Sequence, residues 1–185
     1  WIGSESGSQK ILDRMGRRAT VEDIQAKTAL LRSRGIEVGM FIMLGYEGEE
    51  VEDLEATVEH LKTSSPDVFL TTVAYPIRGT DYYREVETRL AIGGPWSERT
   101  DRDLRIGGRH SRRYYRHATR WMVNEVRAHR ARTESRRLDE LRRWLTARAS
   151  RLGMWLSRNE CEEDGVAASG RGWGSSEERA RRDDP

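Results

Sequence analysis

Three short segments of the sequence combine residues that could bind a polar organic ligand. The first segment, GSESGSQ, offers the carboxylate of Glu5, which can accept two hydrogen bonds from a vicinal diol, and the hydroxyl of Ser6 beside it. Arg17 follows about one short helix later, and its planar guanidinium suits a ligand carboxylate. Taken alone, each of these residues also fits an ordinary surface turn. Together they indicate a site for a ligand that carries a diol and a carboxylate.

The other two segments indicate contact between a flat ring and the backbone. In LGYEG, Leu44 precedes two glycines, Gly45 and Gly48, that let the chain approach a ligand closely. In AYPIRGT, backbone groups around Ala74 and Tyr75 precede a turn. A ligand with a ribose, an amino-acid carboxylate and a flat base would satisfy all three segments. S-adenosylmethionine has those parts.

Apolar periodicity indicates the elements that position these segments. Helices are predicted over residues 8–15, over residues 20–35 with Thr20 as the N-cap, and over residues 51–64. The nearly continuous apolar runs at residues 36–45 and 68–76 predict strands that are buried on both faces. Strands separated by helices pair in parallel with right-handed crossovers, so an α/β fold is expected.

The parallel arrangement predicts where the ligand would bind. In α/β sheets and barrels, ligands bind at the carboxyl ends of the strands. The loops after Ile2, Leu44 and Tyr75 should therefore converge on one edge of the sheet.

Charge divides the chain into three parts that the net charge of +2 conceals. Residues 1–98 carry 11 Lys and Arg against 17 Asp and Glu, a balance of −6. Residues 99–158 carry 18 against 6, a balance of +12, and residues 159–185 carry 4 against 8, a balance of −4. This distribution indicates parts with different roles or partners.

The basic part predicts two Arg-rich helices, over residues 112–132 and 134–157. An apolar stripe of five residues recurs at helical spacing in the second helix, and its members are Leu138, Leu141, Leu145, Leu152 and Trp155. We favour docking of these helices on each other or on the acidic part, or a role as a substrate lid. Two alternatives remain: nucleic-acid binding, because Tyr114, Tyr115, Trp121 and Trp144 are interleaved with arginines, and contact with an anionic lipid surface or lipid substrate.

Three parts of the sequence together resemble one known family. The series GSESGSQKILDRMGRRATVEDI, GIEVGMFIMLGYEGE and PDVFLTTVAYPIRGTDYY resembles the second half of the catalytic barrel of radical S-adenosylmethionine enzymes. It is most similar to the branch that also carries an N-terminal cobalamin-binding domain. The similarity spans roughly residues 1–87. It implies strands four to six of a parallel (β/α)6 partial TIM barrel, followed here by an all-α Arg-rich extension.

The resemblance also implies roles for the residues at the strand ends. Glu5 and Ser6 would contact the ribose of S-adenosylmethionine, and Arg17 would contact its methionyl carboxylate. The adenine would meet the backbone near Leu44, Gly45, Ala74 and Tyr75.

The family's three-cysteine motif, which holds a 4Fe-4S cluster, is absent from this sequence. The single Cys161 stands in a polar tail, so neither that cluster nor a disulfide scaffold is expected within the chain. The chain also begins with Trp1 near the end of a predicted strand, and we expect a C-terminal fragment of a longer protein, inactive alone. Its partner would be the N-terminal remainder, with the cluster ligands and any cobalamin domain. The alternative is a decayed homologue.

The family's activity would then belong to the parent protein. The resemblance implies that the reduced cluster cleaves S-adenosylmethionine to a 5'-deoxyadenosyl radical, which abstracts hydrogen from an organic substrate. Methyl transfer often follows in the cobalamin-dependent branch. No residue of the chain identifies the substrate or a catalytic side chain.

The sequence finally predicts the division of the chain and its setting. We expect a half barrel at residues 1–91, a linker at 92–111, a basic helical extension at 112–158 and a disordered tail at 159–185. No apolar run reaches about 18 residues, so no transmembrane segment is expected and a cytoplasmic setting is the default.

Overall fold

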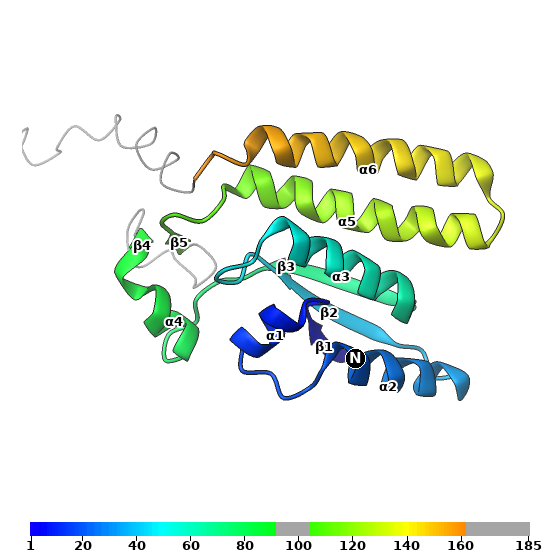
Figure 1. Ribbon diagram of the computed structural model, residues 1–185, viewed down its shortest axis with the longest axis horizontal. Helices are drawn as coiled ribbons and strands as arrows, with labels where there is room; N and C mark the ends of the chain where they lie inside the picture. Colours follow the sequence, from blue (N-terminus) through cyan, green and yellow to red (C-terminus); the bar gives the residue numbers. More distant parts are fainter. Residues whose placement is uncertain (92–103, 162–185) are drawn as a thin grey trace, which may run out of the picture. The chain divides into compact units, whose positions relative to one another are not determined.

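The computed structural model describes residues 1–91 and 104–161 and divides the chain into two compact units. The first unit contains residues 1–75 and 110–159 (Figure 1). The second contains, among the described residues, 76–91, 104–109 and 160–161. Each unit is treated separately below.

A parallel sheet of three strands forms the centre of the first unit. Its strands β1 (Ile2–Glu5), β2 (Gly39–Leu44) and β3 (Val68–Val73) lie in the order β1-β2-β3. Met40 of β2 is in register with Ile2 on one side and with Phe69 on the other. The predicted parallel pairing and the mixed α/β class are therefore confirmed. A partial TIM barrel is a finer statement and is treated under the proposed function.

Three helices connect the strands. They are α1 (Gln9–Arg14), α2 (Val21–Ser33) and α3 (Val51–Ser64). The N-cap predicted at Thr20 is confirmed, because its hydroxyl accepts a hydrogen bond from the Asp23 amide at 3.1 Å. The Asp23 carboxylate accepts the Thr20 amide in return, which completes a capping box. The capping residues Thr20 and Asp23 therefore fix the start of α2, after the chain leaves α1.

Helix α5 (Arg112–Thr133) belongs to the same layered unit. The ring of Tyr115, near its start, lies against Gly45 at the carboxyl end of β2. Near its end, the guanidinium of Arg130 donates to the backbone carbonyls of Pro66 and Asp67, just before β3. Helix α5 therefore runs antiparallel to the strands, as the helix of a β/α unit does. Helix α6 (Arg137–Ser157) packs along α5 (Figure 1).

The helices cover one face of the sheet and leave the other face open. Met40 and Ile42 of β2 are at most 1 % exposed and pack in the main core with α1, α2, α3, α5 and α6. Phe41 and Leu70, which are in register on neighbouring strands, are 45 % and 49 % exposed. Trp1 stacks on Phe41 with ring centroids 4.8 Å apart. The prediction that both strands are buried on both faces is therefore wrong for this chain.

The second unit contains short elements only among its described residues. These are α4 (Asp81–Val86), a 3-10 turn (Glu87–Arg89) and an antiparallel pair of strands, β4 (Leu90–Ala91) and β5 (Arg105–Ile106). Strand β5 lies within the segment that the sequence assigned to a linker.

Two sequence predictions fall largely outside the described residues. Residues 92–103 of the linker predicted at 92–111 and residues 162–185 of the tail predicted at 159–185 are not described. Within the described parts of the chain, no helix is both long and apolar enough to cross a membrane.

The one-sided core predicts unequal costs for identical truncations. Leu61 of α3 is fully buried, whereas Leu30 of α2 is 57 % exposed. We expect Leu61→Ala to lower the free energy of unfolding by about 2–5 kcal/mol, because it leaves a cavity. Leu30→Ala should change it by less than about 1 kcal/mol. Urea denaturation followed by circular dichroism measures both, and equal costs would contradict the assigned core.

Candidate functional site

Glu5 and Arg17 lie together on the open face of the sheet. Arg17 Nη2 donates to the Gly3 carbonyl at 2.8 Å and lies 4.0 Å from Glu5 Oε1. A Cβ on Gly3 would meet both the Glu5 carboxylate and the Arg17 guanidinium, so both groups cover the Gly3 side of β1. Gly3 is in register with the exposed Phe41, which identifies that side as the open face. The predicted anion- and diol-binding groups are therefore neighbours.

The conformation of Glu5 depends on an irregularity at the end of β1. Glu5 has a φ of 62°, a left-handed value that is uncommon outside glycine. The register between β1 and β2 shifts between Gly3 and Glu5, as in a β-bulge. Bulges often redirect side chains next to functional sites, and a strained residue that the surrounding structure holds in place is a sign of such a site.

The second and third predicted segments meet at the ends of β2 and β3. The Ala74 amide donates to the Leu44 carbonyl at 2.7 Å, so the parallel pairing continues to the segment ends. Both residues are buried, and Tyr75 is half-buried. Gly45 has a φ of +73°, and the Tyr115 ring occupies the space where its side chain would be. A flat ligand ring therefore cannot approach Gly45 from that side.

The hydroxyl of Ser6 points into the protein rather than toward Glu5. Ser6 is fully buried, and its Oγ lies 3.2 Å from Thr57 Oγ1 and accepts the Ser8 amide at 3.1 Å. The Gly7 amide donates to the same Thr57 hydroxyl at 2.9 Å. The ribose contact predicted for Ser6 thus lacks a free hydroxyl, and only Glu5 and Arg17 supply predicted side-chain contacts on the open face.

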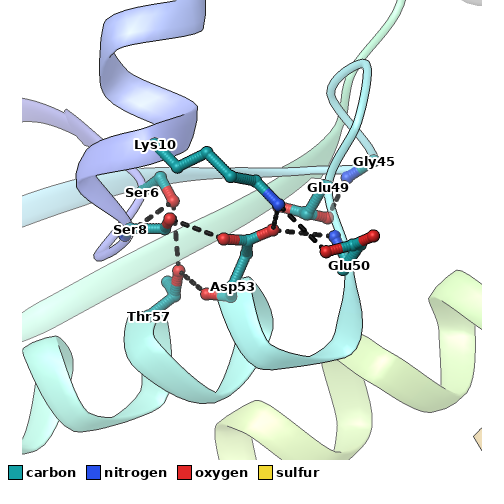
Figure 2. A network of polar contacts seen from close by, with 8 residues as sticks. All are labelled: Ser6, Ser8, Lys10, Gly45, Glu49, Glu50, Asp53 and Thr57. Carbon is teal, nitrogen blue, oxygen red and sulfur yellow. Dashed lines mark hydrogen bonds and ion pairs between the residues drawn. The ribbon is translucent and has the colours of Figure 1, made fainter.

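Asp53 anchors a polar network between the first loop and α3 (Figure 2). Its Oδ1 accepts the Ser8 hydroxyl at 2.6 Å, and its Oδ2 lies 2.7 Å from Lys10 Nζ and accepts the Glu50 amide at 2.9 Å. Burial alone would raise the pKa of Asp53, but the hydrogen bonds from Lys10, Ser8 and Glu50 outweigh it and lower the pKa. Asp53 is therefore an ionised carboxylate that fixes the first loop on α3.

Glu49 lies in the turn between β2 and α3, next to this network (Figure 2). Its Oε2 accepts the Gly45 amide at 2.6 Å. Its Oε1 is shielded from solvent and has no hydrogen-bond partner in the part of the chain that the structure describes. Burial raises the pKa of Glu49 to about 8, although the Gly45 amide opposes the rise. The carboxyl group is therefore largely protonated at neutral pH.

Sequence reasoning missed this polar network. A signal existed for Asp53, which stands in the first turn of a predicted helix where an acid can cap the backbone. No local signal reveals the burial of Glu49, which depends on tertiary packing. Gly7 also has a specific role, because a Cβ there would lie 2.5–2.6 Å from atoms of His60, Ala56 and Thr57.

The described residues do not form a site for an iron-sulfur cluster. Among residues 1–91 and 104–161, no group of three or more His, Cys, Asp or Glu side chains could hold a metal ion. Cys161 is the single cysteine of the chain. The arrangement can bind a polar ligand, because the carboxylate of Glu5 and the guanidinium of Arg17 lie side by side at the carboxyl end of β1.

Comparison with models of protein families finds no match for the sequence, and neither does comparison with curated proteins.

The Asp53 network predicts a stability change that depends on pH. Asp53→Asn keeps the shape of the side chain but removes its charge, so we expect the free energy of unfolding to fall by about 2 kcal/mol at pH 7. Because the pKa of Asp53 is lowered on folding, the wild-type advantage exists above the unfolded value of 3.8 and disappears as pH falls through the folded pKa. Urea denaturation at several pH values measures it.

The control for this variant is Asp13→Asn, which changes an exposed carboxylate. Its effect should stay below about 0.5 kcal/mol. A similar loss in both variants would show that Asp53 has no special role.

The raised pKa of Glu49 predicts the opposite dependence on pH. The folded state retains the proton that the unfolded state releases near 4.5, so stability should fall as pH rises from there to about 8 and then level off. Glu49→Gln keeps an acceptor for the Gly45 amide without the ionisation, so its melting temperature should fall less over that interval. Melting curves from pH 5 to pH 9 measure this.

Glu52→Gln provides the matched control, because Glu52 is exposed on the same loop-helix segment. Its melting temperature should follow that of the wild type across the pH range. Parallel curves for wild type and Glu49→Gln would contradict the assigned burial of the carboxyl group.

Proposed function

We propose that this chain is part of a radical S-adenosylmethionine enzyme and that it contributes side-chain contacts to the bound S-adenosylmethionine. The observation that carries the proposal is the pairing of Glu5 with Arg17 at the carboxyl end of β1, on the sheet face that the helices leave open. A carboxylate suits the ribose diol, and a guanidinium suits the methionyl carboxylate. The resemblance of the three strand-end segments to that family points to the same ligand.

The open face supports the finer proposal of a half barrel, strands four to six of a (β/α)6 barrel. In a barrel of this type, helices cover the outer face of the strands and the inner face encloses the ligand and packed side chains. The three strands are parallel, and α3 and α5 cover the same face of the sheet. The exposed Trp1, Phe41 and Leu70 are apolar side chains of the kind that a closed barrel would bury.

The proposal assigns binding to this chain and leaves the radical chemistry to the rest of the enzyme. The described residues lack ligands for the 4Fe-4S cluster, so no step through it is derived from them. The cluster and any cobalamin would be held by an N-terminal remainder, which is then the partner of this chain. The organic substrate and a methyl-transfer outcome stay predictions of the resemblance.

The nucleic-acid alternative gains little support from the basic helices. Stacking requires accessible aromatic rings. Tyr114, Tyr115 and Trp121 are 2–6 % exposed and pack in the core, and of the four aromatics that suggested this function only Trp144 is exposed. Phosphate contacts by the arginines would remain, without the base-stacking part of the hypothesis.

Ligand titration tests the proposal directly. We expect isothermal titration calorimetry to detect S-adenosylmethionine binding by the wild-type chain, and Glu5→Gln and Arg17→Ala each to raise Kd at least about tenfold. Each removes a charge-assisted contact, and tenfold corresponds to about 1.4 kcal/mol. Arg18→Ala and Glu22→Gln, which change exposed neighbours, should leave Kd unchanged.

Two results would count against this function. One is equal loss of affinity in the site variants and in the two controls. The other is the absence of any S-adenosylmethionine binding by a chain that is shown to be folded.

The reading frame upstream of Trp1 provides an independent test. An in-frame three-cysteine motif would supply the missing cluster ligands. A stop codon and a start site immediately before Trp1 would contradict the proposal that a longer enzyme exists.

A further inference from the structure

Helix α6 directs its apolar stripe away from the protein. All five residues of the stripe are 53–87 % exposed, although apolar periodicity would ordinarily place them inside; they are Leu138, Leu141, Leu145, Leu152 and Trp155. Two further large apolar residues of the same helix are also exposed, namely Trp144 and Leu156. We call these seven residues the outer face of α6. The two basic helices do pack on each other, as expected, but the stripe is not the surface of α6 that packs.

Small residues on the opposite side of α6 explain this orientation. The buried residues Ala147, Ser150 and Ser157 pack α6 along α5 together with Met154. At Gly153, a Cβ would lie 2.5 Å from the His117 ring of α5. At Gly153 the two helices therefore approach too closely for any side chain. The exposure of the outer face is set by the packing of the other side and is not a local irregularity.

Arginines accompany the outer face. Within α6, residues 137–157 carry five arginines against two acids. Arg148 falls in the stripe itself, three residues after Leu145 and four before Leu152, and its guanidinium lies 5.3 Å from the Trp144 ring. Of the two acids, Asp139 is paired with Arg136 and Arg143. The outer face is thus apolar and cationic, although Arg148 also borders a hollow that Glu55, Glu59 and Glu125 of α3 and α5 line.

A hollow adjoins the outer face at the carboxyl end of α6. Leu152 and Trp155 line it together with Val51 and Tyr114, and its volume is about 340 Å³. Arg158 also lines this hollow and lies over the Trp155 ring at 4.3 Å, whereas Arg151, which lines it too, is ion-paired with Glu55. Apolar walls next to guanidinium groups suit a molecule with a hydrocarbon part and an anionic head.

We propose that the outer face of α6 binds the surface of an anionic phospholipid bilayer. The helix would lie in the plane of the interface, with leucines in the acyl region and arginines at the phosphates. Tryptophan is favoured at that depth because its ring is amphipathic, and Trp144 and Trp155 lie three turns apart on this face. This interaction does not depend on the proposed S-adenosylmethionine site.

Charge favours a bilayer over a second copy of the chain. A symmetric helix pair would bury Arg148 of both copies in an apolar seam, together with other arginines and no carboxylate in the stripe of α6. At a membrane surface the same side chain extends toward phosphate groups while its methylenes stay in apolar surroundings. The face is also broader than the two-position stripe of a coiled coil, because Trp144 and Leu156 widen it.

Vesicle flotation tests the proposal with the full chain. We expect the chain to float with vesicles of equal parts phosphatidylglycerol and phosphatidylcholine, far less with phosphatidylcholine alone, and to be released by high salt. Leu145→Glu combined with Leu152→Glu should weaken binding at least about tenfold. Arg148→Gln should weaken it about fivefold, in line with the contribution of one arginine near an anionic surface.

Matched controls separate this surface from general effects of charge and apolarity. Leu30→Glu with Ile36→Glu changes two other exposed apolar residues, and Arg34→Gln removes another exposed arginine. Both should bind as the wild type does. Unchanged melting temperatures show that the variants remain folded.

Fluorescence tells which side chains enter the bilayer. Phosphatidylcholine brominated on its acyl chains, mixed with phosphatidylglycerol, should quench the wild-type tryptophan emission. The quenching should disappear when Trp144→Phe and Trp155→Phe are combined.

Three outcomes would overturn the proposal. They are no flotation with anionic vesicles, equal loss of binding in the controls, and a dimer in sedimentation velocity that Leu145→Glu with Leu152→Glu dissociates. Binding to RNA without binding to vesicles would overturn it as well.

Discussion

The buried carboxylate of Asp53 is the interaction on which the rest of the first unit depends. It accepts the backbone amide at the start of its own helix and the Ser8 hydroxyl of the first loop, and it pairs with Lys10. One ionised group therefore caps the start of α3 and fixes the chain that leaves β1. Because that chain follows directly from Glu5, the position of the candidate ligand-binding carboxylate is set by a contact on the other side of the sheet. Burying such a group without these partners would cost several kcal/mol, on the order of a large part of a domain's stability.

The second constraint is that the core is built on one face of the sheet only. Met40 and Ile42 are covered by helices, whereas Phe41, which alternates with them in β2, and its register partner Leu70 in β3 remain exposed. Alternation along a strand makes this unavoidable when only one side is covered. The sequence of β2 nevertheless is apolar at every position except Gly39, which is the composition of a strand covered on both faces. The composition of β2 therefore suits a strand that is covered on both faces, whereas the helices of this chain cover only one.

Local signals were sufficient to predict the parallel sheet, the N-cap at Thr20 and the approximate bounds of the long helices. They also assigned Glu5 and Arg17 to one ligand, and the structure brings the two side chains within 4.0 Å in the connection between β1 and β2. They failed for Ser6, whose hydroxyl turns inward because the close approach at Gly7 brings Thr57 within hydrogen-bonding distance. Periodicity identifies which residues share a face, but only tertiary packing decides whether that face or the opposite one is buried.

Helix α6 shows how this ambiguity is resolved. A leucine stripe and a row of small residues could each form the packing surface of α6. The small residues face α5, because α5 approaches closely enough at Gly153 to exclude a side chain there. The first unit has two exposed apolar faces, one on the sheet around Phe41 and one on α6, and their different charge favours different partners. The sheet face around Phe41 offers mainly hydrocarbon beside strand edges that can still pair, which suits further strands. The α6 face places Arg148 among its leucines, and the stripe itself holds no carboxylate that could pair with the Arg148 of a second copy; the nearby acids Glu55, Glu59 and Glu125 belong to α3 and α5. An interface with water and phosphate supplies anionic partners for that arginine.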